Sequence, residues 1–180
     1  MAFGASVKVV PSLKVNVDLK WVNYAVWDSL NFKFNKSVDF LTIGSAIETL
    51  AGEDDSDPNA LRMPRNYQDV WSYALGVEYQ YNDRFVWRAG YEPRGNAIPD
   101  KSIDFLVPLG DADLYTIGFG CNLDRYSHFD AAFGYLRSGF DIASGVSKNA
   151  NGTKAGDVVY NPYAYLDLKA TTTALIFAIS

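Results

Sequence analysis

Few side chains in this sequence could carry catalysis. It holds one histidine, His128, and one cysteine, Cys121. His128 and Asp130 are two residues apart, which places them on one face of a strand, and Ser127 and Ser72 are available as nucleophiles. Neither serine lies in the glycine pattern of a nucleophile elbow, and a hydrolase needs its nucleophile, base and orienting group to converge. The sequence therefore predicts that the protein is not an enzyme, with His128 as polar lining.

Motifs for cofactors and metals are also missing. The sequence has no phosphate loop, dinucleotide fingerprint or zinc-ligand spacing. A single cysteine allows neither an internal disulfide nor a thiolate metal cluster. Asp55, Asp57 and Asn59 match the opening of a calcium loop, but the glycine and the final glutamate of such a loop are absent. We interpret this segment as a solvated acidic loop and expect no cofactor and no metal.

Several charged residues recur at alternate positions of segments with β periodicity: Lys14, Asp18, Lys20, Glu78, Arg88 and Asp130. Alternation puts them on one face of a sheet, and we expect that face to line a wet lumen as an internal ion-pair ladder. The alternative is that Lys14, Lys20 and Arg88 contact the head group of an anionic ligand. The net charge is −5 without a basic cluster, which argues against nucleic acid as a partner.

The element that would position these charges best is the segment 70–91. Its first half alternates an apolar face with a small or polar one, and the apolar face consists of Trp71, Tyr73, Leu75, Val77, Tyr79 and Tyr81. A three-residue turn predicts a hairpin that pairs Tyr79 with Trp87 and Glu78 with Arg88. An aromatic outside and a charged inside are typical of a transmembrane β-barrel.

We expect about seven strands in all. Besides the two of this hairpin they are 3–10, 13–34, 115–123, 129–135 and one within 158–179. We interpret 13–34 as one long strand with a β-bulge. Two strands joined by a turn near 24–28 are the alternative, which we disfavour because that stretch lacks glycine and proline.

Short connections alternate with three long loops, predicted at 35–69, 93–112 and 139–157. Transmembrane β-barrels sort their connections in this way, with tight turns on the periplasmic side and long loops outside. An antiparallel barrel closes with an even number of strands. We therefore predict an all-β fold, in which residues 1–180 are a single transmembrane β-barrel domain and the C-terminal portion of a larger barrel.

Apolar residues of the long loops are the candidates for ligand binding. In the first loop Phe40, Ile43, Ile47 and Leu50 lie at helical spacing, which predicts a short amphipathic helix. In the second loop Phe105 and Leu106 belong to an apolar patch. The alternative is that all six only pack the loops over the mouth of the barrel.

Several motifs together resemble one family of proteins. They are QDVW (68–71), ALGVEY (74–79), YNDR (81–84), RAGY (88–91), AIPD (97–100) and YTIGFG (115–120), together with the segments 13–30, 108–113 and 130–136. In this order they resemble the FadL-type outer-membrane transporters of long-chain fatty acids, a family that includes toluene and xylene channels. The similarity covers most of the chain.

The resemblance implies a fourteen-stranded barrel with an N-terminal hatch, of which nothing here corresponds to the hatch or the first seven strands. It also implies passive uptake of a hydrophobic compound, such as a long-chain fatty acid, across the bacterial outer membrane. The expected partners are outer-membrane lipid, a hydrophobic small-molecule ligand and the missing N-terminal half-barrel. A small structural β-barrel without transport activity and a soluble β-barrel lipid-binding protein are the alternatives.

Overall fold

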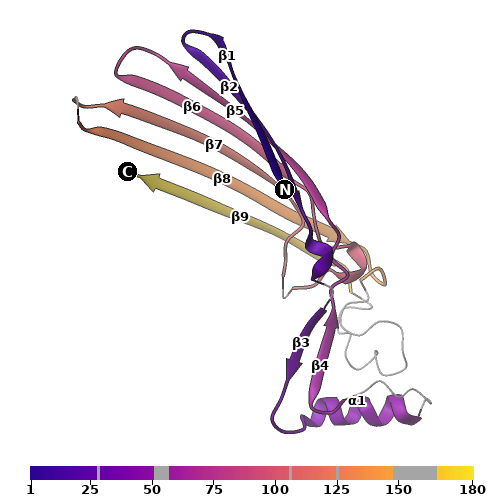
Figure 1. Cartoon of the computed structure of the whole chain (residues 1–180). Coiled ribbons are helices and arrows are strands. Elements are labelled where there is room, and N and C mark those ends of the chain that lie inside the picture. Colours follow the sequence, from indigo (N-terminus) through magenta and orange to yellow (C-terminus); the bar gives the residue numbers. More distant parts are fainter. Residues whose placement is uncertain (28, 51–56, 106, 125, 148–165) are drawn as a thin grey trace.

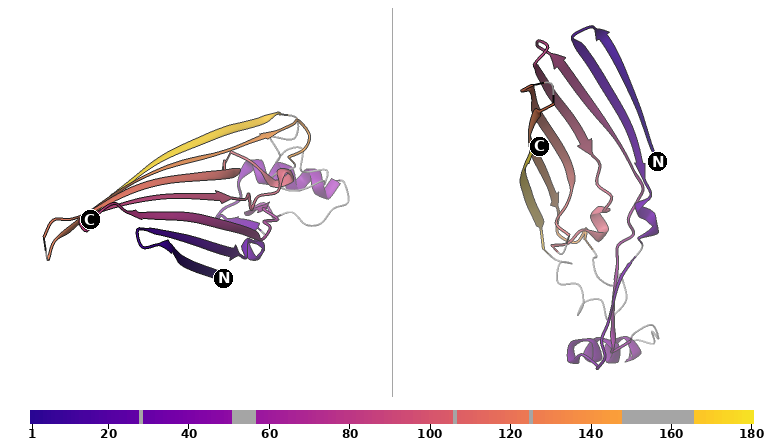
Figure 2. Two further views of the ribbon diagram at one scale, coloured as in Figure 1. Left: turned by 90° about the horizontal axis from the view of Figure 1, so that it is seen from above. Right: turned by 60° about the vertical axis from the view of Figure 1, so that its left-hand side comes forward.

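The computed structural model of the chain describes residues 1–27, 29–50, 57–105, 107–124, 126–147 and 166–180. Seven strands form one sheet in the order β1-β2-β5-β6-β7-β8-β9, and every neighbouring pair is antiparallel. Their bounds are β1 (Ala2–Val10), β2 (Leu13–Val22), β5 (Val70–Gln80), β6 (Phe85–Arg94), β7 (Asp111–Asn122), β8 (His128–Ile142) and β9 (Leu168–Ile179). The sheet is curved and open, with β1 and β9 as its edges (Figures 1 and 2). The predicted all-β fold is confirmed, and this sheet has the predicted seven strands, while two more strands form a separate hairpin.

The connections are sorted between the two ends of the sheet. The β1–β2, β5–β6 and β7–β8 turns lie at one end, and the strand ends that the long connections join lie at the other, called the loop end below (Figure 1). In the β5–β6 turn the Asn82 Oδ1 atom accepts hydrogen bonds from the backbone N–H groups of Arg84 and Phe85, both at 2.9 Å. In the β7–β8 turn the backbone N–H groups of Tyr126 and Ser127 bond Asp124 and lower the pKa of its carboxyl group.

The interpretation of 13–34 as one bulged strand is wrong. β2 ends at Val22, a 3₁₀ helix η1 follows at Tyr24–Val26, and β3 (Ser29–Lys33) pairs with β4 (Ala60–Pro64) in a separate hairpin. The chain turns without glycine or proline because the Asp69 carboxylate accepts a hydrogen bond from the Ala25 N–H at 3.1 Å. A partner 44 residues away along the chain leaves no local signal in the sequence.

The long connections have other bounds than predicted, and the first two contain regular structure. The segment 35–69 contains β4 as well as the predicted helix, α1 (Asp39–Leu50). Between β6 and β7 a 3₁₀ helix η2 lies at Asp100–Ser102, and β7 already begins at Asp111. β8 extends four residues into the segment predicted as the third loop, to Ile142. None of the described helices is long and apolar enough to cross a bilayer.

The two faces of the sheet differ in the way the alternation predicts. On the outer face Trp87 is 54% exposed and Tyr79 is 44% exposed. Their register, Tyr79 opposite Trp87 and Glu78 opposite Arg88, is the predicted one. Ten residue steps separate Trp71 from Tyr81, or about 33 Å of strand. At a tilt of about 40° the apolar band is about 25 Å tall, the height of the apolar band of membrane barrels.

Buried apolar side chains are concentrated at the end of the sheet where the long connections attach. One cluster, called the loop core below, consists of Tyr67, Ile98, Ile103, Ile142 and Leu168, with Val107 and Phe140 packed against it. A smaller cluster centres on Leu41 of α1, which contacts Val38 and Leu61. Among the described residues, the exposed large apolar side chains of the sheet outnumber the buried ones. This distribution fits a sheet whose outer face meets lipid rather than water.

Candidate functional site

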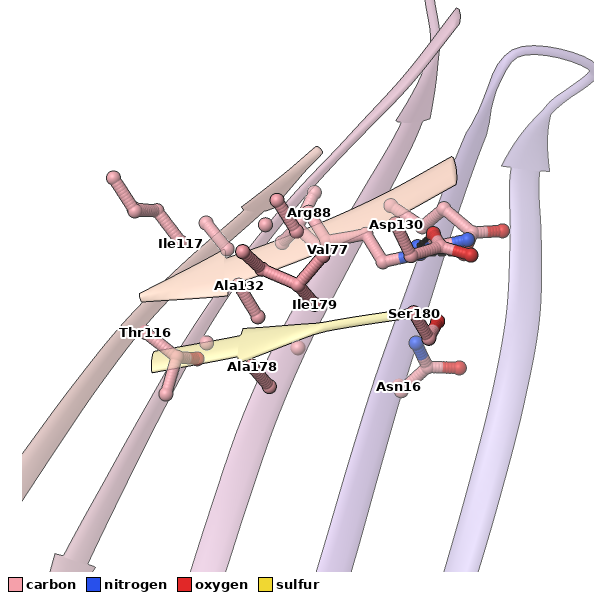
Figure 3. A pocket seen from close by; sticks show the side chains of 16 residues that line it. Asn16, Val77, Arg88, Thr116, Ile117, Asp130, Ala132, Ala178, Ile179 and Ser180 are labelled. Carbon is pink, nitrogen blue, oxygen red and sulfur yellow. Dashed lines mark hydrogen bonds and ion pairs between the residues drawn. The ribbon is translucent and has the colours of Figure 1, made fainter. Parts of the chain in front are cut away.

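An ion-pair ladder crosses the inner face of the sheet. The Arg88 guanidinium on β6 donates from Nε to Glu78 Oε2 on β5 at 2.9 Å and from Nη1 to Asp130 Oδ1 on β8 at 2.6 Å. His128 Nε2 lies 3.1 Å from Asp130 Oδ2. In Figure 3 Arg88 and Asp130 converge, while Ile117 points away from them. The ladder therefore joins three of the predicted lumen charges and adds His128.

The ladder can form because a glycine of β7, Gly120, lies beneath the Arg88–Asp130 ion pair. β7 is the strand between β6 and β8. A Cβ atom at Gly120 would lie 2.7 Å from both Asp130 Oδ1 and Val86 Cγ1, and 3.3 Å from Arg88 Nη1. Such distances are well inside van der Waals contact. The missing side chain at Gly120 thus provides the space through which Arg88 reaches across one strand to Asp130.

Replacing Gly120 with alanine is expected to push Asp130 and Arg88 apart and to lower the free energy of unfolding by about 1–3 kcal/mol. The measurement is the urea midpoint of the refolded protein, read from the shift in gel mobility between folded and unfolded forms. Gly118→Ala in the same strand is the matched control, because its new Cβ would meet atoms no closer than 3.5 Å. In an Asp130→Ala background the Gly120→Ala cost should shrink, and an unchanged cost would contradict this explanation.

The remaining predicted lumen charges share this face without joining the ladder. Lys14 lies opposite Glu78 in the register, and Asp18 and Lys20 follow at alternate positions of β2. Within the described part of the chain, none of the three makes an ion pair. Beside the ladder is a hollow lined by small residues of several strands, namely Gly76, Gly90, Thr116, Gly118, Ala132 and Ala178 (Figure 3). The inner face thus combines a charged band with open space.

The candidate ligand-binding residues of the first long loop lie on α1, beyond the β3–β4 hairpin (Figure 1). Ile43 is 57% exposed and Leu50 is 89% exposed, while Ile47 is partly buried. The side chain of Phe40 lies outside the described part of the chain. Because the helix packs through Leu41, its two exposed apolar side chains remain available on the surface.

The candidate residues of the second long loop lie elsewhere. The Phe105 ring is 6.3 Å from the Phe140 ring of β8, centroid to centroid. Leu106 falls outside the described residues. Phe105 therefore rests on the sheet beside the loop core, whereas α1 lies past the end of the sheet (Figure 1).

A buried ion pair that the sequence did not reveal ties two loops together. Arg65 and Asp104 are each 1% exposed, and Arg65 Nη1 lies 2.5 Å from Asp104 Oδ2. The other carboxylate oxygen of Asp104 accepts a hydrogen bond from the Val107 N–H at 3.1 Å. Burial raises the pKa of the adjacent Tyr67 hydroxyl, an effect that the Arg65 charge opposes. Both charged residues lie in irregular segments, so no periodicity marked them.

Chemistry at the acidic loop and at His128 finds no support among the described residues. Asp55 lies outside them, and Asp57 accepts a hydrogen bond from the Asn59 N–H at 2.8 Å, as in an ordinary turn. The described residues hold no group of three side chains suited to a metal ion. The interaction that His128 makes there is with Asp130, not with a serine.

The chain is similar to known proteins both in sequence and in structure. A family model described as "Outer membrane protein transport protein (OMPP1/FadL/TodX)" matches residues 1–180. The crystal structure of a Pseudomonas aeruginosa FadL homologue is similar with a TM-score of 0.66 at 15% identity. The match covers 99% of this chain and 34% of that chain, so the chain spans about a third of that protein's length. No curated protein matches.

Proposed function

The chain belongs to the family of outer membrane transport proteins described as OMPP1/FadL/TodX, and we propose that it forms part of the wall and loop surface of a channel for passive uptake of hydrophobic compounds across the bacterial outer membrane. Long-chain fatty acids are the proposed ligands. The observation that carries the proposal is the two-faced sheet: exposed aromatic rings such as Trp87 on one face and the Glu78–Arg88–Asp130 ladder on the other.

The two edges of the sheet define what must complete the wall. β1 and β9 each pair with one neighbour, and unpaired backbone groups in hydrocarbon cost several kcal/mol each. Both edge strands run from the loop end to the end with the short turns. The strands that close the wall in antiparallel fashion must therefore both run the opposite way. We propose that a further, N-terminal half-barrel with an odd number of strands supplies them.

Two other functions were open from the sequence. A soluble β-barrel lipid-binding protein would bury its aromatic residues, so the exposed outer rows disfavour it. A small structural barrel would need to close on itself, and the linear strand order of the sheet gives it no support. Uptake of hydrophobic compounds thus remains the better proposal, with no catalytic step.

Capture of the ligand is assigned to the exposed apolar side chains of α1, Ile43 and Leu50, together with Ile47, Phe105 and the predicted residues Phe40 and Leu106. The double variant Ile43→Ser/Leu50→Ser removes two apolar contacts, each worth about 1.5 kcal/mol. We expect uptake of a labelled long-chain fatty acid at low concentration to fall about tenfold or more. The assay uses cells that carry the full-length protein as their single uptake route.

The matched control is Thr42→Ser/Thr49→Ser on the same helix, which should leave uptake unchanged. If cells with the wild-type protein take up no more fatty acid than cells without it, the proposed function is wrong. If the wild-type protein transports and the Ile43→Ser/Leu50→Ser variant does so equally well, only the assignment of α1 is wrong.

A further inference from the structure

Arg137 carries a charge on the outer face of the sheet that no described residue neutralises. It lies on β8 two residues beyond Tyr135, so both side chains belong to the same face, and both are exposed. Within the described part of the chain the Arg137 guanidinium makes neither an ion pair nor a side-chain hydrogen bond. A charge on the lipid-facing side of a membrane barrel is costly unless it lies near the aqueous interface. The position of Arg137 therefore needs an explanation.

The carboxylate nearest to Arg137 in the register is held by another residue. Asp113 of β7 lies directly opposite Arg137. Its Oδ1 atom accepts a hydrogen bond from the Tyr91 hydroxyl of β6 at 2.7 Å, and no ion pair joins it to Arg137. Opposite charges facing each other across two strands usually pair. Here the tyrosine takes the carboxylate and leaves the guanidinium open.

The other two acidic side chains of this surface are engaged as well. Asp111 accepts a hydrogen bond from the Asn96 N–H at 2.7 Å. Asp141 lies opposite Lys169 of β9 and forms an ion pair with its Nζ atom at 2.5 Å. Arg137 thus needs an acceptor that the described residues do not supply.

The register places Arg137 at the boundary between hydrocarbon and head groups. Across β7, β8 and β9 one outer row is apolar or aromatic, and the next row toward the loop end is polar. The first row is Tyr115, Tyr135 and Leu175, and the second is Asp113, Arg137 and Thr173. Rows of aromatic residues mark the interfaces of membrane barrels, and the long loops mark the outer side. Arg137 therefore lies just above the aromatic row, at the level of the outer-leaflet head groups.

The surface around Arg137 suits a phosphate group. A guanidinium binds phosphate through two parallel N–H groups, and it does so better than an ammonium group. Thr173 lies directly opposite Arg137, and Thr171 is the next residue of the same face of β9; both are exposed and offer hydroxyl donors. Gly139, the next residue of this face of β8, carries no side chain. The guanidinium is therefore flanked by donors and by free space.

We propose that Arg137 binds the phosphate of an outer-leaflet lipid head group, with the hydroxyls of Thr171 and Thr173 beside it. Strands β8 and β9 would thereby hold one phosphorylated lipid against the outside of the channel wall. The inference goes beyond the proposed uptake, because it concerns the lipid-facing side of the wall and requires only that the sheet crosses the membrane. An acidic side chain elsewhere in the full-length protein is the alternative acceptor, and the test distinguishes the two.

The experiment measures binding of lipid A, a phosphorylated glycolipid of bacterial outer leaflets, to the purified full-length protein in a neutral detergent. Native mass spectrometry provides the affinity. We expect lipid A to bind about threefold to tenfold more tightly than lipid A from which the phosphates have been removed, because water weakens an exposed pair. Arg137→Met should abolish this preference without changing binding of the dephosphorylated lipid. Arg137→Lys keeps the charge but loses the bidentate geometry and should fall between them.

A second variant tests the role of the tyrosine that holds Asp113. Tyr91→Phe removes the hydroxyl, which frees the carboxylate to pair with Arg137 opposite it and to compete with the lipid phosphate. This variant should bind lipid A more weakly, and Tyr91→Phe/Asp113→Asn should restore the affinity. The matched control is Arg94→Met, which removes an arginine from the inner face at the same end of the sheet and should not alter the preference.

The outcomes decide between the two acceptors. If the wild-type protein binds both lipids equally, or if Arg137→Met keeps the preference for lipid A, the inference is wrong. If Arg137→Met lowers the urea midpoint in detergent without lipid and leaves lipid A binding unchanged, the acceptor is a side chain of the protein, and the lipid assignment is overturned. None of these measurements depends on uptake, so a failure of the proposed function is recognised separately.

Discussion

Replacing Gly110 with alanine is expected to lower the free energy of unfolding by about 3 kcal/mol or more, the upper range for forcing extra atoms into packed structure. Gly110 is buried immediately before β7, against Gly139 of β8. A Cβ atom there would overlap the Gly139 carbonyl oxygen and lie 2.6 Å from its carbonyl carbon. A backbone carbonyl held in a sheet cannot turn aside as a side chain can, so β7 and β8 must separate at this point.

The separation would also break two hydrogen bonds. The Ser138 hydroxyl accepts from the Gly110 N–H and donates to the Gly110 carbonyl oxygen, both at 3.1 Å. Ser138→Ala removes these bonds without adding bulk, at about 1 kcal/mol for each bond. The fraction of folded protein and its urea midpoint should therefore rank wild type, then Ser138→Ala, then Gly110→Ala. A Gly110→Ala protein as stable as Ser138→Ala would show that the close approach of the two strands is not required.

The sheet was predictable because its information is local. Alternation over ten residues, as in Trp71 to Tyr81, fixes which face each side chain takes, and a three-residue turn then fixes the register of Glu78 against Arg88. None of these steps needs knowledge of a distant residue. The same locality explains why α1 could be predicted from helical spacing.

The loop end was not predictable because its contacts join residues far apart in the sequence. The Ala25–Asp69 hydrogen bond decides where β2 ends, and the β3–β4 pairing converts part of a predicted loop into a hairpin. Arg65 and Asp104 are 39 residues apart in segments without periodicity. Polar pairs of this kind become recognisable only when the fold brings the loops together.

For the candidate site too, local features were predictable from the sequence and contacts between distant residues were not. The lumen charges Glu78, Arg88 and Asp130 could be assigned to one face by counting, but the distance that Arg88 spans depends on the glycine at position 120 of the intervening strand. The sequence shows that the inner face carries glycines. It does not show that the Arg88–Asp130 ion pair occupies the space above Gly120, because that depends on the three-dimensional structure. The exposure of Ile43 and Leu50 likewise depends on which face of α1 packs, and that face is the one with Leu41.

Replacing Ile117 with lysine is expected to destabilise the protein in membranes or detergent by about 2–4 kcal/mol, the cost of a lysine facing lipid at mid-depth. Ile117 lies on the outer face of β7, in the row that pairs it with Ala89 and Phe133, and is 62% exposed. In a water-soluble sheet an isoleucine so exposed could become lysine at almost no cost. The urea midpoint of the protein refolded into lipid vesicles measures the difference.

Two matched substitutions in the same strand distinguish the effect of depth in the membrane from the effect of which face of the sheet carries the charge. Thr116→Lys places the charge on the inner face beside the hollow, where water in the lumen should make the change nearly neutral. Cys121→Lys keeps the outer face but moves four residues toward the short turns, where the cost should fall to about 0–1 kcal/mol because the aqueous interface is near. Equal stability of the Ile117→Lys and Thr116→Lys proteins would mean that the aromatic outer face does not meet lipid, and the assignment of this sheet to a channel wall would then have no physical basis.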